Sequence, residues 1–270
     1  MKFLAILLAM FVSRLLFSPH SRPFNPGAGA TRDRLIIWVF LSLCLEWALW
    51  QNAGVGYGLP VLLLEVLLLG YWLGRSTPGN LLREYAALWR CGAYEGASRH
   101  AEAELGMHRH ERADRPQRLH YRICQCYLQQ LLVTLFVPLF WFWLAGIPGL
   151  LLAVLMQPQL ELTRPSKLAY AVQWLPVRLL GFSFFIAGSG VGAWEALRRS
   201  SLQRNDIRWL FRIALGAVGD YAGSSGPAGN LAQRGADEME ALQRLSGRAL
   251  LLWLLFIALM AVAGLETRIY

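Results

Sequence analysis

The stretch ALLLWLLFIALMAVAG, residues 249–264, contains no charged side chain. A helix needs about 20 mostly apolar residues to cross the hydrocarbon core of a bilayer, and fewer where neighbouring helices thin it. Other windows are similarly or nearly as apolar: residues 3–17, 35–50, 59–74, 131–156 and 169–188. The sequence therefore predicts an all-α, polytopic membrane protein with about 4–6 membrane-embedded helices.

The overall composition favours the same class of protein. Of the 270 residues, 56% are hydrophobic, which exceeds what one soluble core of this length can bury. The net charge of +9 comes almost entirely from arginine, since only Lys2 and Lys167 are lysines. Arginine-rich cytoplasmic loops follow the positive-inside rule, and the sequence has no recognisable nucleic-acid-binding motif. We therefore expect a lipid bilayer as the partner, and not nucleic acid.

The charged segments orient the chain across the membrane. Residues 75–122 hold nine arginines against six acids, whereas residues 51–58 hold no charge. Residues 35–74 are thus predicted to form a helical hairpin whose turn faces away from the cytoplasm. Residues 195–248, with eight arginines against six acids, are also predicted to be cytoplasmic. The expected regions are an N-terminal helix and hairpin (1–74), a cytoplasmic helical region (75–130), broken membrane segments (131–188), a second cytoplasmic region (189–248) and a C-terminal membrane helix (249–270).

Local signals predict several of the helices outside the apolar windows. Thr77 and Pro78 provide a cap and a first-turn proline for one helix. An amphipathic pattern predicts a second helix over residues 94–105, and a third begins near residue 115 and continues into the membrane at residue 131. After the glycine-rich linker of residues 222–230, a polar helix is expected to begin at Leu231 and merge with the last span.

Two apolar windows are interrupted. Arg14 lies within residues 3–17, which argues for an uncleaved membrane helix and against a signal peptide. Residues 131–156 contain Pro138, Gly146, Pro148 and Gly149. This window is either one long kinked span or a re-entrant pair of half-helices, and both alternatives need protein or water around the exposed backbone. Such breaks can line binding sites in membrane proteins.

Charged residues in the apolar windows define a candidate binding site. Glu46 and Glu65 lie on the two arms of the hairpin, at depths that differ by roughly 3 Å. A charge in hydrocarbon costs about 2.5–3.5 kcal/mol, so such residues are candidates for function, although a structural ion pair is the alternative. Arg178 is the expected partner, and Arg14 is a second one. Together these residues predict an intramembrane polar centre.

The stretch WLPVRLLG, residues 174–181, adds Pro176 to this centre. A proline inside a helix donates no hydrogen bond and clashes with the carbonyl four residues earlier, here that of Val172. The helix is therefore expected to kink or begin anew at Pro176. The freed carbonyls could bind the guanidinium of Arg178.

Residues 100–126 collect several side chains that can bind metals. They are His100, His108, His110, Glu111, His120, Cys124 and Cys126. Their spacing matches no zinc signature, so we predict a solvated, arginine-rich surface without a metal. The chain also lacks a P-loop and a nucleophile elbow, and we expect no cofactor and no catalytic residue.

Several stretches together resemble the AmpE family of inner-membrane proteins from Gram-negative bacteria. They are REYAALWRCGAYEGASRHAEAELG (83–106), LFVPLFWFWLAGIPGLLL (135–152) and VQWLPVRLLGFSFFIAG (172–188), with the early hairpin and the C-terminal span. The resemblance covers nearly the whole chain. It implies a multi-pass protein of the bacterial inner membrane with a regulatory signalling role in β-lactamase induction, linked to peptidoglycan recycling and the antibiotic response. It also implies a non-enzymatic protein. Our own hypothesis for its mechanism is that a small anionic ligand or a segment of a protein partner contacts Arg178.

The same segments resemble the adenosylcobinamide-phosphate synthase family more distantly. Pro148 and Gly149, and the box from Pro176 to Leu179, match that family's motifs, but residues 157–160 replace its polar run with QPQL. The alternative implied by this resemblance is a divergent membrane ligase.

Overall fold

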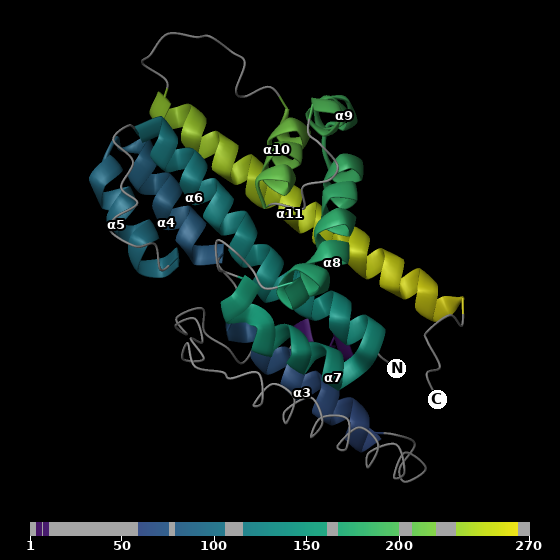
Figure 1. Ribbon diagram of the computed structural model, residues 1–270. Coiled ribbons are helices and arrows are strands. Elements are labelled where there is room, and N and C mark those ends of the chain that lie inside the picture. Colours follow the sequence, from purple (N-terminus) through teal and green to yellow (C-terminus); the bar gives the residue numbers. More distant parts are fainter. Residues whose placement is uncertain are drawn as a thin grey trace. The chain divides into compact units, whose positions relative to one another are not determined.

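The computed structural model describes residues 4–6, 8–10, 59–75, 79–105, 116–160, 167–199, 207–219 and 231–263 (Figure 1). This part of the chain is almost entirely helical and contains no strand, as the all-α prediction requires. Residues 4–6 and 8–10 are helical. The later helices are α3 (Leu59–Arg75), α4 (Gly79–Arg90), α5 (Tyr94–Leu105), α6 (Pro116–Leu131), the π-helical turn η3 (Leu132–Phe136), α7 (Val137–Leu160), α8 (Lys167–Ala187), α9 (Gly190–Arg199), α10 (Ile207–Val218) and α11 (Leu231–Val262).

Among the described residues, three helical stretches are long and apolar enough to cross a membrane: Gln117–Gln157, Lys167–Ala187 and Gly235–Val262. The apolar part of α3, Leu63–Leu73, is shorter. The three stretches coincide with windows that the sequence predicted. The remaining predicted membrane segments, residues 3–17 and 35–50, lie wholly or largely outside the described residues.

The chain divides into two compact units. The first comprises Met1–Thr77, Leu131–Pro176 and Leu254–Tyr270, and the second comprises Pro78–Gln130 and Val177–Trp253. The boundaries fall inside helices, so α8 leaves the first unit at Pro176 and α11 leaves the second at Trp253.

In the first unit, α7 reverses direction at Gly146. This residue has φ 68° and ψ −144°, a backbone conformation that is essentially restricted to glycine. Beyond the turn, a Cβ atom on Gly149 would collide with the carbonyl oxygen of Trp141, and Nε2 of Gln157 donates to the carbonyl of Val133 at 3.3 Å. Because both contacts join residues nearly equidistant from Gly146, the two arms are antiparallel. The antiparallel arms are not one long kinked helix, whereas a re-entrant position of the pair in a membrane stays a prediction.

The π-helical turn η3 explains a second set of contacts in this unit. A shift from α to π hydrogen bonding displaces backbone carbonyls from their usual donors. The carbonyl of Val133 accepts from Gln157, and that of Thr134 accepts from Nε1 of Trp72 at 3.0 Å. Two buried side chains from other helical segments therefore hydrogen-bond the irregular turn.

Candidate functional site

The residues of the predicted intramembrane centre fall in different parts of the structure. Glu65 is buried in α3 of the first unit, and Arg178 is half-buried in α8 within the second unit. Each makes polar or electrostatic interactions. Glu46 and Arg14 lie outside the described residues. The proposed pairing of Arg178 with these acids stays a prediction.

The proline lies inside α8, which continues from Lys167 to Ala187, so the expectation that the helix begins anew at Pro176 is wrong. Pro176 lies inside the helix and cannot donate to the carbonyl of Val172. Nε1 of Trp141 donates to that carbonyl instead, at 3.0 Å. The carbonyl of Val172 thus has an indole donor that the sequence did not indicate, and the expectation that Arg178 binds the freed carbonyls stays a prediction.

A second polar site, which the sequence did not predict, is buried in the second unit. His120 of α6 is at its centre and is 4% exposed. Its Nδ1 lies 3.2 Å from the hydroxyl of Tyr85 in α4, and its Nε2 lies 3.4 Å from a carboxylate oxygen of Glu238 in α11. The sulfur of Cys124 lies 3.5 Å from the same Nε2. We call these four residues the His120 cluster.

Aromatic side chains enclose the His120 cluster. Trp89 stacks on Tyr85 with ring centroids 5.5 Å apart and tilts against the imidazole at 5.2 Å. Gly235 of α11 leaves room for this indole, since a Cβ atom there would collide with Nε1 of Trp89. Burial raises the pKa of Tyr85 well above its usual range, and the nearby Cys124 and Glu238 add to the shift. The hydroxyl of Tyr85 therefore stays protonated and can bond to the imidazole.

The amphipathic pattern of α6 explains why these groups are buried. Pro116 begins the helix, a position that suits proline because no intrahelical donor is lost there. The buried residues then recur three or four apart, so that one face of α6 carries Leu119, His120, Ile123, Cys124, Tyr127 and Leu128. His120 and Cys124 are one turn apart on this face. The helical period was thus a signal that could have identified them as buried.

The geometry of the His120 cluster does not suit nucleophilic catalysis. In a thiol–imidazole–carboxylate triad, the thiol and the acid bond to different imidazole nitrogens. Here Cys124 and Glu238 both approach Nε2, and Tyr85 occupies Nδ1. Cys124 is also fully buried, whereas reactive cysteines are accessible. The arrangement instead links α4, α6 and α11 through one imidazole.

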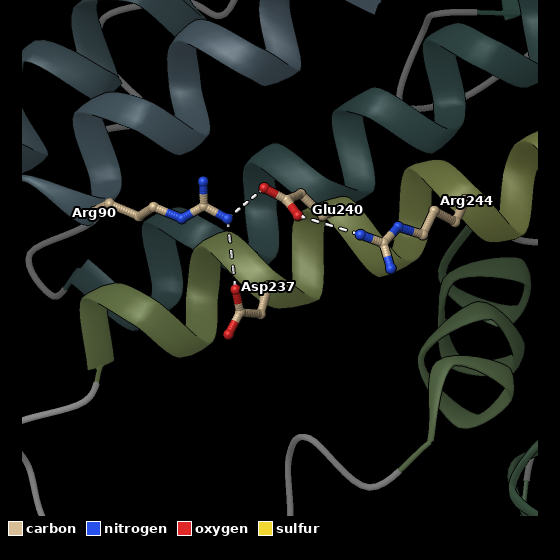
Figure 2. Close-up of polar contacts among 4 residues, drawn as sticks. All are labelled: Arg90, Asp237, Glu240 and Arg244. Carbon is tan, nitrogen blue, oxygen red and sulfur yellow. Dashed lines mark hydrogen bonds and ion pairs between the residues drawn. The ribbon is translucent and has the colours of Figure 1, made fainter.

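Ion pairs near the surface reinforce the contact between α4 and α11 (Figure 2). Arg90 of α4 bonds to Glu240 and lies 3.6 Å from a carboxylate oxygen of Asp237. Arg244, one turn further along α11, lies 3.7 Å from Glu240. Because these side chains are between about one third and three quarters exposed, each pair contributes little, with a median of about 0–1 kcal/mol.

The residues considered for metal binding have different surroundings. His120 and Cys124 are buried, so the prediction of a solvated surface is wrong for them, because they lie on the packed face of α6. His100 lies 3.2 Å from Glu84 of α4, and Cys126 is half-buried. Within the described ranges, no three His, Cys, Asp or Glu side chains are grouped to hold a metal ion. His108, His110 and Glu111 lie outside those ranges.

Comparisons of the chain with protein-family models, curated proteins and solved structures gave no match.

Proposed function

We propose that the protein is a multi-pass inner-membrane protein of bacteria with a regulatory, non-enzymatic role, similar to the AmpE family. The observation that carries the proposal is the position of Arg178. This residue is half-buried near the middle of a helix that is long and apolar enough to span a membrane. Ionisable side chains are costly and rare inside membrane spans, and where they occur they commonly mark functional sites.

Two further observations support this proposal. Glu65 is a second ionisable residue buried in an apolar helix, and it is 6% exposed. The antiparallel arms around Gly146 fit a re-entrant pair in the membrane, since the second arm, residues 147–160, is about 21 Å long at 1.5 Å per residue. That is less than the hydrocarbon thickness of about 30 Å.

The proposed mechanism is a shift between two arrangements of the helices. A small anionic ligand, or an acidic segment of a protein partner, contacts Arg178 and binds one arrangement more tightly. The cytoplasmic arginine-rich helices then carry the change to a downstream partner. The packed His120 cluster supports a regulatory role over an enzymatic one, because its thiol is buried and its imidazole is already occupied.

The test is β-lactamase induction in a Gram-negative host whose own related protein has been deleted. Arg178→Ala should abolish the response to a β-lactam while the protein remains in the membrane fraction. Arg178→Lys keeps the charge but not the planar, bidentate geometry, so it should restore part of the response. The control is Lys167→Ala, which removes an exposed positive charge from the first turn of the same helix and should change nothing. Full induction by Arg178→Ala would contradict the proposal.

A further inference from the structure

The end of α8 and the helix that follows it, α9, carry a continuous exposed apolar face. Phe182 and Ile186, one turn apart on α8, are 61% and 54% exposed. Val191 and Trp194 on α9 are 82% and 58% exposed. All four belong to the second unit. Several large apolar side chains exposed next to one another indicate a surface that contacts another molecule, such as a protein or a lipid.

Aromatic contacts connect the two helices along this face. Phe182 stacks on Phe185 with ring centroids 6.4 Å apart, and Phe185 meets Trp194 edge-on at 6.5 Å. These aromatic contacts extend from the last turns of α8, a helix that can span a membrane, to the short helix α9 that follows it. Whatever surrounds the exposed side of the candidate span therefore also reaches Trp194.

The opposite side of α9 is fixed against α10, so the exposed face cannot turn inward. The backbone N–H of Ser189 donates to the carbonyl of Ala217 at 2.6 Å. The helices approach so closely that a Cβ atom on Gly192 would collide with the carbonyl of Gly216. Ala193 is fully buried on this side. The orientation of Val191 and Trp194 relative to α10 is thus set by backbone contact.

The exposed face of α9 combines apolar side chains with a positively charged one. Val191, Trp194 and Arg198 are spaced three and four residues apart and share one face of α9. Val191 and Trp194 lie in the first half of α9, which is nearer to α8 along the chain. Arg198 is exposed in the last turn, and Glu195 lies between Trp194 and Arg198 in the sequence. Tryptophan is enriched at the boundary between acyl chains and headgroups, and a nearby arginine can reach lipid phosphates.

We propose that α9 lies in the interface of a phospholipid bilayer, with Val191 and Trp194 at the boundary between headgroups and acyl chains. The occupant of the exposed face is lipid, because the face continues the exposed side of a candidate membrane span and has the aromatic and basic composition of interfacial helices. The inference rests on the membrane setting proposed above. It adds that α9 anchors the end of α8 at the bilayer surface.

The test uses the full-length protein in nanodiscs and tryptophan fluorescence. Because the chain has 11 tryptophans, the emission of one residue is obtained as the difference between wild type and a Trp→Phe variant. Three variants are needed: Trp194→Phe on α9, Trp174→Phe on an exposed position of α8, and Trp209→Phe at a buried position of α10. Quenching is measured with lipids brominated at known acyl positions and with aqueous iodide.

The inference predicts that bromolipids quench Trp194, most strongly when the bromines lie nearest the headgroups. Trp174 should also be quenched by bromolipid, whereas Trp209 should be affected little by either quencher. If Trp174 is quenched by bromolipid but Trp194 responds only to iodide, the interfacial position of α9 is refuted and the membrane setting is retained. If bromolipids quench neither residue, the membrane setting and the inference both fail.

Discussion

In the first unit, three neutral side chains donate to backbone carbonyls. Trp72, Trp141 and Gln157 donate to carbonyls at the π-helical turn and at the proline of α8. In the second unit, ionisable side chains contact one another, with His120 between Glu238, Tyr85 and Cys124. The first arrangement suits low-dielectric surroundings, because no charge is buried when an indole or amide satisfies a carbonyl.

Whether neutral or ionisable groups form these hydrogen bonds depends more on how apolar the helix is than on which unit it belongs to. Ser183 and Trp253 lie in those apolar parts of α8 and α11 that fall in the second unit, and Nε1 of Trp253 donates to the hydroxyl of Ser183 at 2.8 Å. That hydroxyl donates to the carbonyl of Leu179, also at 2.8 Å. Neutral donors thus also serve in an apolar part of the second unit, where Arg178 is an ionisable exception, and the ionisable cluster joins the polar ends of α6 and α11 to α4.

The largest effect is expected when the His120 cluster loses its acid. Glu238→Ala leaves the buried Nε2 of His120 without the carboxylate that faces it, which costs about 1–3 kcal/mol, and the cavity left by the shortened side chain adds to this loss of unfolding free energy. Glu238→Gln keeps a hydrogen-bonding oxygen and should cost less. Chemical denaturation in detergent micelles measures both. The control is Glu240→Ala, which removes a more exposed acid from the same helix. Equal, small losses for Glu238→Ala and Glu240→Ala would show that the cluster contributes no special stability.

An intermediate effect is expected at the turn of α7. Gly146→Ala places a side chain in a backbone conformation that costs of order 1–3 kcal/mol, and the free energy of unfolding should fall accordingly. Gly247→Ala is the matched control, because Gly247 lies in α11 with no atom near its missing Cβ. That change should stabilise the helix by up to about 1 kcal/mol. The account of the turn would be wrong if both variants gained stability.

The smallest effect is expected at the surface pairs of Figure 2. Arg90→Ala removes two contacts to α11 between half-exposed groups, so it should cost about 0–1 kcal/mol. The loss should shrink as salt is added, because exposed charges are screened. Denaturation at low and high ionic strength measures this dependence. A salt-independent loss above this range would mean that Arg90 acts through packing.

Much of the helical architecture could be predicted because it depends on local pattern. The amphipathic repeat predicted residues 94–105, and α5 has those bounds. Leu231 was expected to begin a polar helix that merges with the last span, and α11 begins there. A helix was expected after Thr77 and Pro78, and α4 begins at Gly79, although the cap itself lies outside the described residues. In each case, neighbouring residues carry the information.

The contacts of the candidate sites could not be predicted in the same way, because they join residues far apart in the sequence. Pro176 indicated that a carbonyl would lose its donor, but nothing local pointed to Trp141 as the replacement. Likewise, the helical period of α6 could place His120 on a buried face, but nothing local pointed to Glu238 on a distant helix as its partner. The pairing of Arg178 and the topology across the membrane remain predictions.

The central claim is that neutral side chains satisfy the carbonyls freed by irregular helices, and a double-mutant cycle on Trp141 and Pro176 tests it most directly. Trp141→Phe leaves the carbonyl of Val172 without its donor and should cost about 1–3 kcal/mol of unfolding free energy. Pro176→Ala restores a backbone N–H, so in that background the cost of Trp141→Phe should fall, giving a coupling of about 1 kcal/mol or more. If the two changes are simply additive, Trp141 does not replace the missing donor and the claim is contradicted.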